Sequence, residues 1–328
     1  MPGRRACCFL VPGDWHTPTG GYTYDRRLVQ ALRAAGWAVQ THRLDGDWPW
    51  PDAAALAVTR TCVEALTAGS LVVADGLAFG ALPGFVQRHA ERLRWVALVH
   101  HPLHMETGLD ETMRHDLHRS EEQALQGARQ VVVTSRSTAQ DVAAMAVPPD
   151  RIAVVEPGTD PMLPPRGDGG TGGTGRVRLL CVAALIPRKG HAVLLQALAG
   201  LAGQDWVLHN VGSATRDAQT AARLHAMSMA AELAGRVFWH GAVDAAALRA
   251  QYAAADVFVL PSLHEGYGMA VAEALAFGLP VLASSAGALA QTLPADAGLH
   301  VPPGDAIALR TALAQLMADP GLRARLAA

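Results

Sequence analysis

Short apolar runs alternate along the chain with stretches whose apolar residues recur at helical spacing. In the first half, the runs predict buried strands and the intervals between them predict helices. These strands are expected at residues 6–11, 38–42, 71–74, 95–99, 130–134 and 152–155. Alternation of short buried strands with helices is typical of a doubly wound parallel sheet, so we predict an α/β fold.

A second series of apolar runs follows a glycine-rich stretch. It predicts strands at residues 178–183, 206–211, 237–240, 257–260 and 281–283. The stretch at residues 165–175 has too few large side chains to build a core, so we expect a flexible connection there. We predict two Rossmann-like domains with a cleft of variable width between them. Their expected bounds are residues 1–160 and 177–328, with a linker at residues 161–176.

Composition narrows the class of protein. Half of the residues are hydrophobic, 17% are charged, and the formal net charge of −2 gives no basic surface for nucleic acid. We find no apolar run long enough to span a bilayer and no signal-peptide core, and therefore expect a cytoplasmic protein. The four cysteines, Cys7, Cys8, Cys62 and Cys181, have no metal-ligand spacing. We interpret them as small buried hydrophobic residues.

Residues 256–284 carry the strongest candidate chemistry. Their pattern predicts a buried strand, a polar loop, a helix at residues 268–277 and a further strand. The helix is apolar on every face except at Glu273, so we expect it to be buried. A buried carboxylate needs a polar partner. That partner is a ligand in one interpretation, and an arginine or a neighbouring helix end in the other.

The loop before this helix favours the ligand. Glu265 lies at the carboxyl end of the strand, which is where open α/β sheets bind ligands. The amides of Tyr267, Gly268 and Met269 open the helix and form a positive dipole end suited to a phosphate. Carboxylates that bind hydroxyls beside amides that bind a diphosphate predict a site for a sugar nucleotide.

The segment PSLHEGYGMAVAEALAFGLPVLAS resembles the Glu-x7-Glu signature of the retaining glycosyltransferases of family 4. The resemblance extends to TGGYTYDRRLVQALRAAGWAV, VAALIPRKGHAVLLQAL and AGLHVPPGDAIALRTAL, and covers roughly residues 6–328. It implies the GT-B architecture of two facing Rossmann-like domains. It also implies retaining hexosyl transfer from a nucleoside-diphosphate sugar to a glycan, lipid-linked or small-molecule acceptor, with no cofactor. A peripheral contact with the inner face of the membrane is compatible with such an acceptor.

In the second half, Arg188 and Lys189 stand between a strand and the start of a helix, where they would face a pyrophosphate. The family pattern places a further arginine at the position of Ala184, and Arg188 is the candidate to replace it. A solvated basic turn is the alternative interpretation. Gly212 also follows a strand, and it would allow close approach of a base or ribose or serve as an ordinary turn glycine.

In the first half, the candidates lie where strands end. Gly20 and Gly21 precede a helix predicted at residues 22–35 and would let a phosphate or an acceptor hydroxyl approach the backbone. His100 and His101 end a strand at the place where the family has a histidine beside the transferred sugar. Structural histidines satisfied by the backbone are the alternative for at least one of them. The remaining candidates for the acceptor side are His104, Glu106, Ser135 and Arg136.

The implied mechanism stabilises a departing diphosphate with Lys189, Arg188 and the helix start at Gly268. Glu273 would bind the ribose and Glu265 the donor sugar, without a separate enzymic base. We expect no metal, and interpret Asp45 and Asp47 as turn residues. Two alternatives stay open: a non-catalytic subunit that binds a nucleotide sugar, and a GT-B epimerase or phosphorylase.

Overall fold

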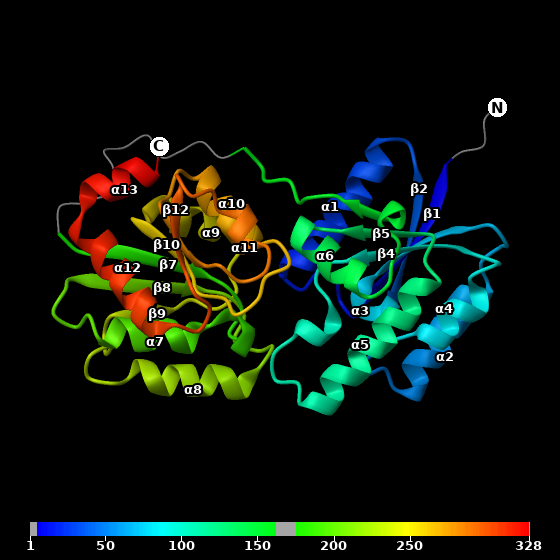
Figure 1. Ribbon diagram of the computed structural model, residues 1–328, viewed down its shortest axis with the longest axis horizontal. Helices are drawn as coiled ribbons and strands as arrows, with labels where there is room; N and C mark the ends of the chain where they lie inside the picture. The colour runs from blue at the N-terminus through cyan, green and yellow to red at the C-terminus, as the bar shows by residue number, and fades with distance from the viewer. Residues whose placement is uncertain (1–4, 162–174, 328) are drawn as a thin grey trace. The chain divides into compact units, whose positions relative to one another are not determined.

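The computed structural model describes residues 5–161 and 175–327, so most of the predicted linker, residues 162–174, lies outside the described residues. The chain divides into two compact units, residues 1–157 and 158–328 (Figure 1). We call them the first unit and the second unit. Within the described residues, each unit contains one six-stranded parallel sheet.

The first unit has the strand order β2-β1-β3-β4-β5-β6. Its strands are β1 (Ala6–Pro12), β2 (Ala38–Leu44), β3 (Leu71–Asp75), β4 (Arg94–Val99), β5 (Gln130–Val133) and β6 (Ile152–Val154). Its helices are α1 (Gly20–Ala34), α2 (Ala53–Glu64), α3 (Gly76–Phe79), α4 (Pro83–His89), α5 (Glu111–Gln126) and α6 (Arg136–Ala144), with short 3-10 turns η1 (Leu103–Met105) and η2 (Pro149–Arg151). The strand predictions are confirmed to within two residues at each end.

Successive side chains of a strand point to opposite faces of the sheet, and helices pack on both faces, so both are buried. On β1, Phe9 packs in a cluster with Val29 of α1. Leu10 points the other way, into a cluster that includes Val63 of α2 and Leu125 of α5. This burial on both faces explains why the strands are continuous apolar runs rather than alternating ones.

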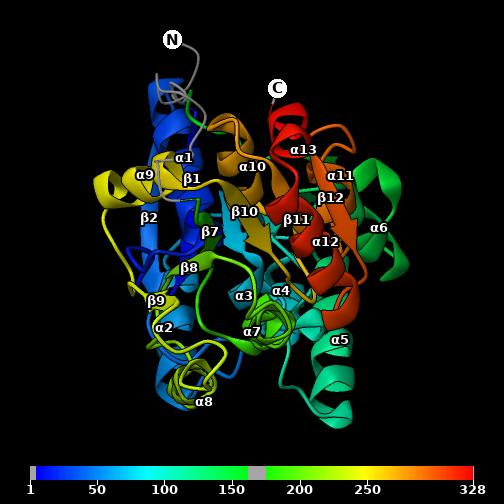
Figure 2. The ribbon, with the colours of Figure 1, turned by 90° about the vertical axis from the view of Figure 1, so that its left-hand side faces the viewer.

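The second unit has the strand order β12-β11-β10-β7-β8-β9. Its strands are β7 (Val177–Val182), β8 (Trp206–Val211), β9 (Val237–Trp239), β10 (Val257–Leu260), β11 (Val281–Ser284) and β12 (Gly298–Val301). Its helices are η3 (Pro187–Lys189), α7 (His191–Ala199), α8 (Ala218–Ser228), α9 (Ala245–Ala254), α10 (Met269–Ala276), α11 (Leu289–Thr292), α12 (Ala306–Ala318) and α13 (Pro320–Leu326). Figures 1 and 2 show α7 and α8 on one face of the sheet and α9 and α10 on the other.

Two predictions about the second unit need correction. Strand β12 was not predicted, since this edge strand has only two buried residues, Gly298 and Val301, and no continuous apolar run. Helix α10 is not fully buried: only its Val271 and Ala274 are. Half of its residues are alanines, which present little apolar surface, so partial exposure costs little free energy.

Within the described residues, no helix combines the length and the apolar character needed to cross a membrane. Of the cysteines, Cys7, Cys8 and Cys181 are buried as predicted, whereas Cys62 is partly exposed.

Candidate functional site

A tight contact in the second unit joins the turn after β7 to the loop after β10. Gly190, which ends η3, has a φ of +69°, and a Cβ atom there would lie 2.0 Å from the carbonyl oxygen of Pro261. The amide of Leu263 donates to the carbonyl of Arg188 at 2.7 Å. Only glycine satisfies both the backbone angle and the space, so it allows the basic turn to pack against the acidic loop.

This contact brings together the Glu265 cluster, which we define as Glu265, Lys189, Arg188 and Ser262. The Nζ of Lys189 lies 2.6 Å from Oε1 of Glu265, and the Ser262 hydroxyl donates to the same oxygen at 2.6 Å. The Nη1 of Arg188 lies 3.7 Å from Oε2. Burial opposes ionisation of Glu265, but the charges of Lys189 and Arg188 outweigh it and lower the pKa to about 2.

The cluster joins residues that the sequence analysis assigned to separate tasks, Lys189 to phosphate and Glu265 to sugar. Arg188 is nearly buried and donates to the carbonyl of His264 at 3.0 Å, so it also orders the loop that carries Glu265. The cations and the acid therefore form one charge-paired unit. Each of them positions the others.

Glu273 lies on α10. We predicted that it is buried, but it is partly exposed. Its Oε2 accepts a hydrogen bond of 2.9 Å from the hydroxyl of Tyr252, which lies on α9. The Tyr252 ring stacks against Phe258 and Phe277 and is buried. The sequence analysis missed Tyr252, whose only signal was a polar aromatic residue at the buried position of α9.

The start of α10 has the predicted position. Gly268 is its N-cap with a φ of +92°, and a Cβ atom there would lie 2.5 Å from Leu289. Tyr267 and Met269 flank this glycine and are partly exposed. The helix therefore begins directly after the loop that carries Glu265.

Gly212 packs against the chain's own backbone, and its proposed approach to a base or ribose stays a prediction. A Cβ atom at this position would lie 2.0 Å from the carbonyl oxygen of Ala183 and 2.8 Å from the amide nitrogen of Ala184. The close approach that requires glycine is thus made by the chain's own backbone after β7.

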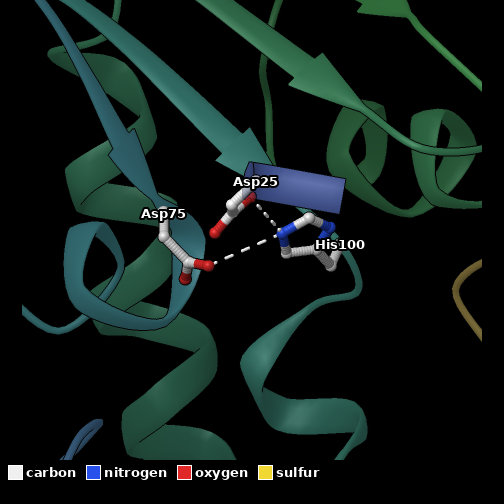
Figure 3. Close-up of side chains that lie close together, drawn as sticks. All are labelled: Asp25, Asp75 and His100. Atoms are coloured by element: carbon white, nitrogen blue, oxygen red, sulfur yellow. Dashed lines mark hydrogen bonds and ion pairs between the residues drawn. The ribbon is translucent and has the colours of Figure 1, made fainter. Parts of the chain in front are cut away.

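The first unit contains a second polar group, the His100 cluster, which we define as His100, Asp25 and Asp75 (Figure 3). His100 follows β4, Asp25 lies on α1, and Asp75 ends β3. The Nε2 of His100 lies 3.0 Å from Oδ1 of Asp25 and 3.5 Å from Oδ2 of Asp75. These three residues have metal-binding side-chain types, and one donor atom from each lies within 4.8 Å of the other two.

The charged groups in this cluster shift one another's pKa values. Burial alone would lower the pKa of His100, but the charges and hydrogen bonds of Asp25 and Asp75 raise it to about 10. Burial raises the pKa of Asp25 to about 7, against the influence of His100. The pKa of Asp75 is lowered: burial acts in the opposite direction, but its hydrogen bonds to His100 and to the amide of Leu77 outweigh it.

The sequence analysis identified His100 but missed both of its carboxylate partners. Asp75 carried a usable signal, because it ends the buried strand LVVAD at the sheet edge where ligands bind. Asp25 carried a weaker one: it lies on the face of α1 that also buries Tyr24 and Val29.

The two candidate glycines of the first unit lie inside a helix rather than before it. Gly20 and Gly21 are the first residues of α1 and do not form a loop before it, because the Thr19 hydroxyl accepts from the amide of Tyr22 and caps the helix there. A Cβ atom on Gly21 would lie 3.2 Å from the ring of His100. Gly21 therefore makes room for the imidazole, while Gly20 is exposed.

The other candidates of the first unit lie around this edge with roles in local structure. Nε2 of His101 is 3.5 Å from Oε2 of Glu106. His104 packs edge-on against His118, and burial together with the charge of His118 lowers the pKa of His104 to about 4. Ser135 is buried as the N-cap of α6.

Arg136 begins α6 and is exposed. Asp45 and Asp47 are exposed as well, and Asp45 pairs with Arg43.

Comparisons with known proteins agree with this architecture. A family model described as glycosyltransferase family 4 matches residues 47–163, and one described as glycosyl transferases group 1 matches residues 173–328. The D-inositol 3-phosphate glycosyltransferase of Xylanimonas cellulosilytica is 34% identical over 230 residues, which cover 63% of this chain and 53% of that protein. The chain thus spans about half the length of this curated relative.

Solved structures resemble the whole chain more completely. Sucrose-phosphate synthase from Thermosynechococcus elongatus has a TM-score of 0.80 at 24% identity, covering 98% of this chain and 92% of that one. HepE from Anabaena, solved in complex with UDP and glucose, has a TM-score of 0.73 at 19% identity, with the same two coverages of 98% and 92%. These likenesses confirm the predicted GT-B fold.

Proposed function

Because the chain belongs to the family 4 glycosyltransferases, we propose that it transfers a sugar from a nucleoside-diphosphate sugar to an acceptor hydroxyl. We further propose that transfer retains the anomeric configuration and needs no metal. The observation that carries this proposal is the Glu265 cluster, in which a buried carboxylate from the loop before α10 pairs with two cations from the turn after β7.

On the donor side, Lys189 would bind the diphosphate while it holds Glu265. An ammonium group can bind a carboxylate and a second anion together because it has three N–H donors. The amides at the start of α10 would add a positive dipole end. HepE, which shares this fold, was solved with UDP, and this supports a nucleoside diphosphate as the leaving group.

Glu265 and Glu273 would select the donor through its hydroxyls. Glu265 is held ionised, so it can only accept hydrogen bonds and would bind a sugar hydroxyl through the hydroxyl's proton. One oxygen of Glu273 is oriented by Tyr252, which would align the carboxylate for the ribose.

Catalysis would follow from stabilising the diphosphate as its bond to the sugar breaks. Charge then builds on the phosphate oxygens, so a cation fixed by its own counter-ion binds the transition state more tightly than the substrate. The leaving phosphate would accept the acceptor's proton on the same face. The inositol phosphate named for the X. cellulosilytica relative makes polyols and their phosphates the first acceptors to test.

The test is incubation with UDP-, GDP- and ADP-sugars, with and without inositol or inositol phosphate, in the presence of EDTA. We expect release of one nucleoside diphosphate, which the acceptor accelerates, and a product with the anomeric configuration of the donor by NMR. A requirement for a divalent ion or inversion at the anomeric carbon would refute the corresponding part of the proposal. Absence of any turnover would refute transfer itself.

A non-catalytic binding role is the second candidate, and Ala184 favours it. The family pattern has an arginine there, and this chain lacks that cation. Tight binding of a nucleotide sugar by calorimetry, without hydrolysis or transfer, would support this role.

A further inference from the structure

His100 has more charged partners than its place at the end of a strand requires. Asp25 and Asp75 come from different elements and converge on the same ring nitrogen, Nε2 (Figure 3). Both carboxylates are buried. The arrangement fixes which edge of the imidazole points inward.

Two buried carboxylates beside each other repel and are costly to desolvate. A positive charge between them offsets both effects, and a protonated imidazole supplies it. Oδ2 of Asp25 has no donor among the described residues. Its neighbour Asp75 can partner it only if one of the two carboxyl groups carries a proton.

Other contacts hold the ring in place. Tyr24 packs edge-on against it with ring centroids 5.4 Å apart, and Gly21 lies against its carbon edge. Thr134 donates to the carbonyl oxygen of His100 at 3.1 Å. The side chain keeps 18% of its surface exposed. Figure 3 shows its second ring nitrogen on the side away from the carboxylates.

We propose that Asp25 and Asp75 are positioning residues that hold His100 as an oriented imidazolium, whose outward N–H donates to a substrate oxygen. The role of His100 as a donor to substrate rests on the proposed glycosyl transfer. The geometry of the cluster does not. With both ring nitrogens protonated, His100 cannot act as a general base. It acts as a fixed charged donor.

The decisive measurement is an NMR titration of the chain with isotope-labelled histidine, with the His100 signal assigned by its loss in His100→Gln. We expect both His100 ring nitrogens to be protonated at pH 7.5 and the ring to titrate well above pH 8. In Asp25→Asn/Asp75→Asn the ring should become neutral at pH 7.5. A wild-type ring that is neutral at pH 7.5 would overturn the proposal, even if neither aspartate variant folds.

Kinetics supply the second readout. Each of Asp25→Asn and Asp75→Asn should lower kcat by about a hundredfold, the typical effect of losing one fixed donor, and change the donor KM by less than about threefold. The exposed Asp45→Asn is the matched control and should change neither value. Unchanged kcat in both cluster variants, with normal melting curves, would mean that the cluster is structural only.

A metal is the competing occupant of these atoms. Elemental analysis of the chain purified without chelator should show no divalent ion dependent on Asp25 and Asp75. One ion per chain that both variants lose would overturn the proposal. If no donor is turned over by the wild type, the proposed function fails while the titration still decides the state of His100.

Discussion

The two units build their polar sites from the same kinds of groups in opposite proportions. In the second unit, one carboxylate, Glu265, lies between two cations. In the first, one imidazole, His100, lies between two carboxylates. In each case the group in the minority is held in its charged form by the majority. In each unit, the charges of neighbouring side chains therefore set the protonation state of one group.

The largest expected effect comes from removing the main cation of the Glu265 cluster. Lys189→Ala leaves a buried carboxylate without its nearest cation, so we expect a loss of about 3–5 kcal/mol in the free energy of unfolding. We also expect kcat to fall about a hundredfold with little change in donor KM, because the ammonium acts mainly on the departing diphosphate. Urea unfolding and initial rates measure the two effects.

Lys189→Met/Glu265→Gln separates these two losses. It removes the charges of this pair and leaves Arg188 with its hydrogen bond to the carbonyl of His264, so part of the stability should return while the rate stays low. Exposed Arg223→Ala is the control for loss of one positive charge. A Lys189→Ala variant with normal kcat and a raised donor KM would show that the cation binds substrate and transition state equally.

Opposite pH responses form the next test of the comparison. The pKa of Glu265 is lowered from 4.5 to about 2, so its contribution is present above pH 4.5 and is lost as the pH falls through 2. The pKa of His100 is raised from 6.5 to about 10, so its contribution is present below pH 6.5 and is lost as the pH rises through 10. Each shift corresponds to about 3–5 kcal/mol at most.

The pKa of Asp25 is raised from 3.8 to about 7, so its contribution to the free energy of unfolding is lost as the pH rises through this range. Urea unfolding from pH 2 to 10 should show that Glu265→Gln flattens the acid limb and His100→Gln the alkaline limb. Equal flattening of both limbs by either variant would contradict the independence of the two clusters.

A smaller effect is expected at Glu273, which is partly exposed and outside both clusters. Glu273→Ala should reduce turnover by more than tenfold, since it removes the proposed ribose contact, while unfolding stays cooperative. Exposed Glu232→Ala is the matched control. Activity within a factor of ten of the wild type, about 1.4 kcal/mol, would remove Glu273 from the principal donor contacts.

The smallest effect isolates the orientation of that carboxylate. Tyr252→Phe deletes the hydroxyl that donates to Glu273 and keeps the stacked ring. We expect a loss of about 1 kcal/mol, observed as a roughly fivefold higher donor KM. In a Glu273→Ala background the same change should leave the KM unaltered. An equal rise there would show that the hydroxyl acts independently of Glu273, for example through the carbonyl oxygen of Ala270 at 3.2 Å.

Much of the fold could be predicted because buried parallel strands are continuous apolar runs, as LVVAD and VFVL illustrate. Edge strand β12 lacked such a run. Glu265 and Lys189 were found because each stands in a recognisable strand-end segment. Their mutual contact was not predicted, because it spans 76 residues of sequence.

Two of the missed residues, Asp25 and Tyr252, share one physical cause. Asp25 is 75 residues from His100 and Tyr252 is 21 residues from Glu273, so no local pattern reports either pair. Gly212 shows the same limit: its position after a strand indicated a close approach, but not that the protein's own backbone makes one.

The fit of Gly190 against Pro261 also bears on the order in which this protein assembles during synthesis. The turn that carries Lys189 reaches its final packing only when residues up to Leu263 have emerged to meet it. A nascent chain that stalls on the ribosome before that point contains Lys189 but still lacks the loop against which the turn packs.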